Sequence, residues 1–574
     1  MSSHFKPNNK NNEIDKVIEA VCNPKYLEKE ELHRDGMARI AGALKDSDEH
    51  FNTILPILRD QFFLPGGRIQ SSVGAIRETT AFNCFVSDTI EDSRLGIFKR
   101  LAEAAETMGL GGGDGFDFST IRPKGALIKT QGSPASGPVS YMKVWDTMCK
   151  TIASAGNRRG AMMAVLRVDH PDIEEFIDAK RVAGELTQFN ISVGITDKFM
   201  TAVENDQNFD LVFEGQVYNT VKARKLWDKI MRSTWSHAEP GVLFLDTINR
   251  KNNLWYCETI TATNPCGEQP LPPNGACLLG SFNLTKYIKF DLFGDSDLDY
   301  DLLKDHIAPV VRMMDNVIDY TIYPLKAQEQ EAKSKRRMGL GVTGVANAAE
   351  MLGLPYGSED MIWWCHDVMT FIRDECYKAS IGLAKDKGPF PLFKAKEFLE
   401  SDFAVTLPTE IRDSIREHGI RNSHLLSIAP TGTISLFAGN VSSGIEPPFS
   451  LEYKRNTVMP DGSVKEWNVL DYAYDQHGII GTTSDQLSAK DHIDVLCTFS
   501  NLVDSACSKT CNVGDDVPFE EFKDLYRRAY IGGASGCTTF RPASIETRGE
   551  VMRIEKEPSG TCFINEYGER ECAD

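Results

Sequence analysis

Residues 165–180 read VLRVDHPDIEEFIDAK, and residues 189–203 read FNISVGITDKFMTAV. Each stretch starts with a short run rich in β-branched residues and continues with apolar residues at helical spacing. This pattern predicts a strand followed by a helix. Similar alternation continues from about residue 81 to about residue 513. Alternation of this length favours one α/β fold, either a closed barrel or a large wound sheet, over several small domains.

The regions before and after this alternation have a different pattern. Helical periodicity covers residues 13–63 and stops at the breaker Leu-Pro-Gly-Gly, which predicts a helical N-terminal region. The C-terminal region contains one helical segment, EEFKDLYRRAYIGG, and then a polar tail. We therefore expect three parts: a helical region over 1–80, an α/β domain over 81–542 and a tail over 543–574.

Composition limits the class of protein. The chain has 574 residues, of which 41% are hydrophobic, so it can bury a large core. Its formal net charge of −19 argues against nonspecific binding of nucleic acid, which requires clustered Lys and Arg. We find no signal peptide and no apolar run long enough to cross a membrane, and we expect a cytoplasmic protein. The 14 cysteines are spread out, so most of them should be buried thiols in a reducing compartment.

The stretch NPCGEQPL, Asn264–Leu271, is the first candidate for chemistry. Its two prolines and its glycine exclude a helix, which leaves an extended or looped backbone. In an extended backbone Asn264, Cys266 and Glu268 would point to the same side. An amide, a thiol and a carboxylate would then face one ligand. The alternative is that the cysteine is simply a small buried residue.

Two further stretches suggest binding of an anion. PTGTIS, Pro430–Ser435, places hydroxyls and backbone N–H groups at a predicted helix start, although an ordinary helix cap would look the same. GLGGGDGF, Gly109–Phe116, follows a predicted helix instead of a strand, so the context of a dinucleotide-binding loop is missing. We find no metal-binding motif and expect no metal site.

Eleven segments in one order resemble the catalytic subunit of ribonucleotide reductases, most closely the adenosylcobalamin-dependent class II enzymes. The resemblance covers roughly residues 62–542. The segments are FLPGGRI, FNCFVSDTIEDS, GNRRGAMMAVLRVDHPDIEEFI, FNISVGITDKFM, EPGVLFLDTINR, NPCGEQPL, ACLLGSFNL, RRMGLGVTG, APTGTISLFAGNVSSGIEPPF, DSACSKTCNV and GCTTFRP.

The resemblance implies a ten-stranded α/β barrel with a central finger loop, and it implies roles for several residues. Cys266 would become a thiyl radical that abstracts the ribose 3′ hydrogen. Glu268 would take the 3′-hydroxyl proton, and Asn264 would bind the sugar. Cys84 and Cys277 would be the pair that supplies the reducing electrons.

The same resemblance implies binding and regulatory residues. Cys562 and Cys572 are candidates for a tail pair that re-reduces the disulfide, although their spacing is longer than we expect of the family. The substrate phosphates would bind to Thr431, Gly432, Thr433, Ile434 and Ser435. The loop that relays the effector's identity would include Asn157, Arg158, Arg159 and Gly160, with Asp92 as a further contact to the effector. A solvated basic pair is the alternative for the two arginines.

The source of the radical follows from the resemblance and from what the sequence lacks. There is no Tyr-Tyr pair of the class I type, since the matching segment reads Thr538-Thr539-Phe540, and there is no class III glycyl-radical motif. Adenosylcobalamin is therefore the expected cofactor. Two alternatives stay open: a class I-like subunit that receives its radical from a ferritin-like metal subunit, and a noncatalytic nucleotide-binding relative.

The expected partners are a ribonucleotide, a dNTP or ATP specificity effector, and a thioredoxin- or glutaredoxin-like reductant. A diphosphate or triphosphate substrate and a monomer or homodimer are equally compatible with the sequence. About 60 residues precede FLPGGRI, which are too few for an ATP-cone. We therefore expect regulation of specificity without inhibition by dATP.

Overall fold

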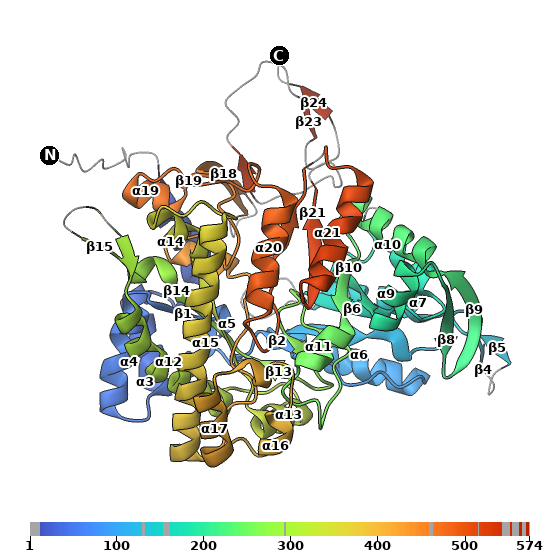
Figure 1. The fold of residues 1–574 in the computed structure, drawn as a ribbon, viewed down its shortest axis with the longest axis horizontal. Helices are drawn as coiled ribbons and strands as arrows, with labels where there is room; N and C mark the ends of the chain where they lie inside the picture. The colour runs from blue at the N-terminus through green and yellow to red at the C-terminus, as the bar shows by residue number, and fades with distance from the viewer. Residues whose placement is uncertain are drawn as a thin grey trace.

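The computed structural model shows an α/β molecule with a large mixed sheet and helices packed on it (Figure 1). It describes the chain except for residues 1–11, 129–131, 153–160, 183, 292–293, 295, 459–462, 515, 542–550, 554–561, 565–569 and 573–574.

The large sheet has eight strands in the order β13-β2-β3-β6-β7-β10-β21-β20. The five strands from β2 to β10 are mutually parallel, whereas β13 and β21 pair antiparallel with β2 and β10. The strands are β2 (Cys84–Val86), β3 (Gly113–Asp117), β6 (Met162–Arg167), β7 (Phe189–Ile195), β10 (Gly241–Phe244), β13 (Ala276–Cys277), β20 (Thr510–Asn512) and β21 (Gly536–Phe540).

The two strand-and-helix units predicted from the sequence are confirmed. Strand β6 is followed by α8 (Ile173–Ile177), and β7 is followed by α9 (Asp197–Glu204). Strand β6 lies parallel to β7, and most of the residues of both strands are buried. The apolar runs are nearly continuous because a parallel strand is covered on both faces.

A second, three-stranded sheet has the order β1-β14-β17. It consists of β1 (Phe63–Pro65), β14 (Leu279–Asn283) and β17 (Gly339–Thr343). The region expected to be helical therefore also contributes a strand, because the apolar residues of β1 pair with β14, with Phe63 opposite Phe282.

The N-terminal helices pack beside this second sheet. They are α1 (Ile14–Val17), the π-helical turn η2 (Ile18–Cys22), α2 (Asn23–Tyr26), α3 (His33–Leu44), α4 (Asp48–Arg59) and α5 (Gly67–Ser72). Ser47 caps α4, since its side chain accepts a hydrogen bond from the His50 backbone N–H. Figure 1 shows α3 and α4 beside α12, on the side of the molecule opposite to β8 and β9.

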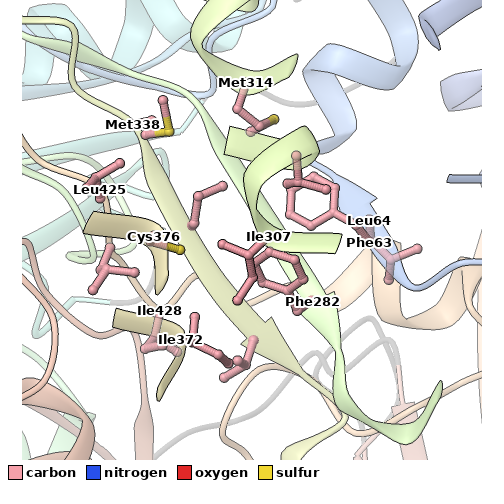
Figure 2. Packing of buried hydrophobic residues seen from close by; sticks show 14 of the residues in the cluster. Phe63, Leu64, Phe282, Ile307, Met314, Met338, Ile372, Cys376, Leu425 and Ile428 are labelled. Carbon is pink, nitrogen blue, oxygen red and sulfur yellow. The ribbon is translucent and has the colours of Figure 1, made fainter. Parts of the chain in front are cut away.

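The largest hydrophobic core lies between the three-stranded sheet and two long helices, α12 (Tyr300–Tyr320) and α15 (Glu359–Lys387). Figure 2 shows Phe63 and Phe282 close to Ile307 of α12, with Ile372 of α15 nearby. Burying each such side chain contributes about 1.5–3 kcal/mol. This core therefore holds the second sheet and the N-terminal region together.

The remaining helices are α6 (Arg94–Gly109), η3 (Phe118–Thr120), α7 (Pro138–Thr151), α10 (Ala223–His237), α11 (Leu245–Lys251), η4 (Leu284–Tyr287), α13 (Lys326–Lys335), α14 (Val345–Met351), α16 (Ala395–Phe398), η5 (Ala404–Thr406), α17 (Thr409–His418), α18 (Gly432–Phe437), α19 (Tyr472–His477), α20 (Ala489–Ser500) and α21 (Phe519–Ile531). The small sheets are formed by β4 (Leu127–Ile128), β5 (Ser133–Pro134), β8 (Asn208–Phe213), β9 (Gln216–Lys222), β11 (Ala262–Thr263), β12 (Pro270–Leu271), β15 (Ile288–Phe290), β16 (Ser296–Leu298), β18 (Glu452–Val458), β19 (Val464–Leu470), β22 (Val551–Arg553), β23 (Cys562–Ile564) and β24 (Arg570–Cys572). Within the part of the chain that the structure describes, none of the helices combines the length and the apolar character needed to span a bilayer.

Candidate active site

The NPCGEQPL stretch forms a tight loop between β11 and β12. The Asn264 N–H donates to the Gln269 carbonyl at 3.1 Å, and the Gln269 N–H donates to Asn264 Oδ1 at 2.9 Å. The Gly267 N–H donates to the Asn264 carbonyl at 3.0 Å, and Gly267 has φ 81°, a conformation that favours glycine. The asparagine side chain thus closes the loop. A turn, not extended alternation, brings Asn264, Cys266 and Glu268 together.

The loop is held against the inner strands of the large sheet. A Cβ on Gly115 of β3 would lie 1.9 Å from the Thr263 carbonyl oxygen, so no other residue fits there. Asn190 of β7 donates through Nδ2 to the Pro265 carbonyl at 2.8 Å. The glycine-rich stretch Gly109–Phe116 therefore allows two backbones to approach closely.

A cavity of about 540 Å³ opens beside the loop, within the size range of small-molecule sites. It brings together the predicted residues Cys84, Asn264, Cys266 and Glu268, together with Thr431–Ile434. The other lining residues are Lys25, Tyr26, Gly66, Gly67, Arg68, Ser71, Arg77, Thr79, Asn83, Gly111, Gly112, Gly113, Ala161, Pro265, Leu279, Gly280, Ser281, Ala429 and Pro430.

Cys84 lies between an amide and a carboxylate. Asn264 Nδ2 donates to the Cys84 sulfur at 3.1 Å, and the Cys84 thiol donates to Glu268 Oε1 at 3.7 Å. Residues from β2 and from the loop, 180 and 184 positions apart in sequence, therefore form one hydrogen-bonded group. A carboxylate in this position can exchange protons with a hydroxyl group of a bound ligand.

Cys277 does not line the cavity but lies next to Cys84. The two residues are direct partners in the antiparallel pair of β2 and β13. Cα atoms of such partners are about 4.5–5.5 Å apart, which is compatible with a disulfide. Burial raises the pKa of the Cys277 thiol well above its usual value. Cys84 and Cys277 are both buried, whereas Cys266 is exposed.

The PTGTIS stretch forms another wall of the cavity, at the start of α18. Thr431 has φ 50°, and its Oγ1 accepts a hydrogen bond from the Gly444 N–H at 2.7 Å and lies 2.9 Å from Thr343 Oγ1. Nothing lies within 4 Å of a Cβ built on Gly432. Ser435 differs from the other predicted phosphate ligands: its hydroxyl donates to the Gly432 carbonyl at 3.1 Å, and the residue does not line the cavity.

Sequence reasoning missed the cationic residues of the cavity. Lys25, Arg68 and Arg77 all line it. Arg68 belongs to the FLPGGRI segment, which was a signal of resemblance but carried no predicted role. Lys25 and Arg77 come from the N-terminal region, and nothing in their sequence setting points to a ligand.

The predicted effector and tail residues lie away from this cavity or outside the described residues. Asp92 forms an ion pair with Arg122 at 2.7 Å and does not line the cavity. Residues 157–160 lie outside the described part of the chain. The backbones of β23 and β24 pair with Cys562 opposite Cys572, and the side chains there are not described.

No group of three or more His, Cys, Asp or Glu residues suited to a metal ion occurs among the described residues. The chemical groups that line the cavity are two thiols, one carboxylate, two amides, hydroxyls and cations. A carboxylate and thiols at one end, with cations and helix-start N–H groups in the same cavity, suit a ligand with one hydroxylated end and one anionic end.

Comparison with known proteins finds similar proteins, among them the following three, which are named vitamin B12-dependent reductases. The protein named vitamin B12-dependent ribonucleoside-diphosphate reductase from Thermoplasma acidophilum is 36% identical in an alignment of 493 positions that covers 80% of this chain and 61% of that protein. A protein of the same name from Mycobacterium tuberculosis is 34% identical in an alignment of 554 positions that covers 90% of this chain and 76% of that protein. The vitamin B12-dependent ribonucleotide reductase of Streptomyces clavuligerus is 27% identical in an alignment of 594 positions that covers 88% of this chain and 61% of that protein.

The chain thus spans about three fifths to three quarters of the length of these relatives. The family model described as ribonucleotide reductase, barrel domain, matches residues 82–540. The matched residues include the NPCGEQPL loop, Cys84, Cys277 and the PTGTIS wall of the cavity. The chain belongs to the ribonucleotide reductase barrel-domain family.

Proposed function

We propose that this chain reduces ribonucleotides to 2′-deoxyribonucleotides by thiyl-radical chemistry. The observation that carries the proposal is the convergence of Cys84, Asn264, Cys266 and Glu268 on one cavity, with Cys277 directly opposite Cys84. The names of the relatives and the family match support the same activity.

In the proposed reaction the ribose lies against the loop. The Cys266 thiyl radical takes the 3′ hydrogen atom, so the C3′–H bond breaks and an S–H bond forms. Glu268 takes the 3′-hydroxyl proton, because it is the carboxylate of the cavity and already accepts a hydrogen bond from Cys84. Asn264 orients the sugar.

The 2′-hydroxyl then leaves as water. Cys84 and Cys277 supply two protons and two electrons and become a disulfide, and Cys266 returns its hydrogen atom to C3′. The sum is one ribonucleotide and two thiols converted to one deoxyribonucleotide, one water and one disulfide. The proposed tail pair, Cys562 and Cys572, would reduce this disulfide and then be reduced by a thioredoxin- or glutaredoxin-like protein.

The proposed cofactor is adenosylcobalamin, in keeping with the names of the relatives. The site fits in one respect: Cys266 is exposed, whereas Cys84 and Cys277 are buried, so a large group can approach the Cys266 sulfur from outside. When bound there, the cofactor supplies the initiating radical through cleavage of its Co–C bond. A class I-like subunit dependent on a metal-bearing partner is not favoured by these relatives.

The proposed architecture joins the two sheets into one ten-stranded barrel with NPCGEQPL as its central finger loop. In this count β13 and β14 form one strand, β1 lies outside the ring, and the segment 426–428 is the strand between β17 and β20. Leu278 alone separates β13, in the large sheet, from β14, in the second sheet. Beyond β17, the Ser427 N–H donates to the Leu340 carbonyl at 2.9 Å. The Ser508 N–H donates to the Ile428 carbonyl at 2.8 Å, next to β20. These bonds support a closed route through all the strands.

The proposal also includes the domain bounds, the phosphate-binding residues and the effector site expected from the sequence. The division at residues 81 and 542 is supported by the family match over 82–540. Thr431–Ile434 would bind the substrate phosphates through the backbone N–H groups at the start of α18, and a dNTP or ATP effector would bind near Asp92 and residues 157–160.

An anaerobic turnover assay tests this function. Purified protein is incubated with a dithiol reductant, adenosylcobalamin, CDP or CTP and a deoxynucleotide effector, and deoxycytidine nucleotide is measured. We expect product from the wild type and from Cys257→Ser, a matched change at an exposed cysteine outside the cavity, and none from Cys266→Ser. Product from Cys266→Ser would exclude the proposed chemistry. Product formed without cobalamin, on addition of a metal-bearing partner subunit, would move the enzyme to class I.

A further inference from the structure

The N-terminal turn of residues 22–26 lies directly against the PTGTIS wall of the cavity. The Cys22 thiol donates to the Thr433 carbonyl at 3.8 Å. The Tyr26 ring packs edge-on against Phe437 of α18, with centroids 5.6 Å apart, and a Cβ on Gly67 would lie 2.8 Å from Tyr26. A segment far away in the sequence therefore completes the proposed phosphate end of the site.

This turn brings positive charge to the cavity of a protein whose net charge is −19. Lys25 lines the cavity and, within the described part of the chain, forms no ion pair with a carboxylate. Burial raises the pKa of the Cys22 thiol to about 12, and the positive charge of Lys25 opposes this rise. Lys25 follows Cys22 by three residues in this helical turn, and the Cys22 thiol contacts Thr433.

Arg77 holds the backbone of the same turn. Its guanidinium donates to the carbonyls of Pro24 at 3.5 Å, Lys25 at 3.5 Å and Leu27 at 3.1 Å. These carbonyls lie at the end of α2, where they lack helical partners. Arg77 thus fixes the position of Lys25 and also lines the cavity.

We propose that Lys25 binds the terminal phosphate of a nucleoside polyphosphate substrate, and that Arg77 positions Lys25 for this contact. The inference rests on the proposed function and adds a residue to its substrate site. The N–H groups of Gly432–Ile434 take one phosphate, and Lys25 takes the next. A monophosphate has no second phosphate for Lys25 to contact. Lys25 therefore favours binding of a diphosphate over a monophosphate.

The test compares binding of CDP and CMP to the full chain by isothermal titration calorimetry. The variants are Lys25→Gln, Lys25→Arg and the matched control Lys29→Gln, which removes the same charge at an exposed position outside the cavity. A charge-assisted contact at a half-buried site predicts that Lys25→Gln weakens CDP binding about tenfold. We expect CMP binding to be unchanged, Lys29→Gln to match the wild type, and Lys25→Arg to retain most of the affinity.

Kinetics give a second readout. In turnover assays Lys25→Gln should raise KM for CDP and leave kcat unchanged, because the reacting groups lie at the loop. Arg77→Gln should also raise KM for CDP, because Arg77 acts through Lys25. Adding Arg77→Gln to Lys25→Gln should therefore raise KM little further.

Two results would overturn the assignment of Lys25 while leaving the proposed function in place: unchanged CDP affinity in Lys25→Gln, or equal weakening of CDP and CMP. Wild-type protein that neither binds nor reduces any ribonucleotide would instead overturn the proposed function and this inference with it.

Discussion

Cys84 and Cys277 lie directly opposite each other across the antiparallel strands β2 and β13. The two residues are far apart in sequence, and no local pattern around either one indicates the other. Cys84 also contacts Asn264 and Glu268 of the loop. The pair therefore joins the buried edge of the large sheet to the cavity, and this geometry leads to the first prediction.

In a Cys562→Ser, Cys572→Ser variant, in which the proposed tail pair cannot re-reduce the active-site cysteines, one turnover without added reductant should convert Cys84 and Cys277 to a disulfide, because these thiols are the proposed source of electrons. Differential alkylation and peptide mass spectrometry will detect the crosslink. Cys365 and Cys376, which are buried in α15, serve as internal references that should stay reduced. A full turnover with both Cys84 and Cys277 still alkylatable would contradict the proposed electron source.

Glu268→Gln should lower kcat by about 10²- to 10⁴-fold, the usual effect of removing a general base. The glutamine keeps the size of the side chain and a carbonyl oxygen that can accept the Cys84 hydrogen bond, so nucleotide affinity should change little. Steady-state kinetics and calorimetric binding of CDP separate the two effects. A large loss of affinity with an unchanged kcat would assign Glu268 a binding role instead.

Thr431→Val should destabilise the protein by about 1–3 kcal/mol, because the Gly444 N–H loses its shorter acceptor in a buried site. The same change should raise KM, since Thr431 precedes the N–H groups that face the cavity. Thr431→Ser keeps the hydroxyl and serves as the control. Urea unfolding measures the stability, and equal stability of the valine and serine variants would refute this account.

Glu258→Gln should destabilise the fold by about 3–5 kcal/mol, the usual effect of breaking a buried ion pair from one side. The Glu258 side chain is 2% exposed and pairs with Lys335 at 2.9 Å and with Arg337. Glu329→Gln removes a carboxylate from surface ion pairs on α13 and should cause no comparable loss of stability. Thermal and urea denaturation compare the two variants.

The pH dependence of stability should reflect Glu350. Burial, and then the nearby Asp471 carboxylate, raise the pKa of Glu350 from 4.5 to about 8. The folded state therefore holds a proton that the unfolded state releases, so stability falls as pH rises from about 4.5 to about 8. Each unit of such a shift corresponds to about 1.4 kcal/mol.

Glu350→Gln removes this titration and keeps an oxygen that can accept from the Thr482 N–H. Its stability relative to the wild type should therefore increase between pH 5 and pH 8 in urea unfolding. Glu410→Gln, at an exposed position on α17, is the control and should track the wild type. Parallel pH profiles for Glu350→Gln and the wild type would show that Glu350 is not the group responsible.

Much of the fold was predictable because it depends on local patterns. The strand-and-helix units at β6–α8 and β7–α9 follow from apolar periodicity, which a local window of sequence contains. Strand β1 was not predicted, because three residues carry no period and their extended conformation depends on pairing with β14.

Within the site, sequence alone determined the chemical types and excluded a helix, because of the prolines and the glycine near Asn264, Cys266 and Glu268. The tight turn was not predicted, because it depends on the hydrogen bonds between Asn264 and Gln269. Tertiary structure alone decided which distant residues meet this loop. Cys277 reaches Cys84 through strand register, and Lys25 reaches the PTGTIS wall through packing of the N-terminal turn. The physical reason is that strand pairing and side-chain packing are set by the energy of the whole core, whereas turns and periodicity are set by a few neighbouring residues.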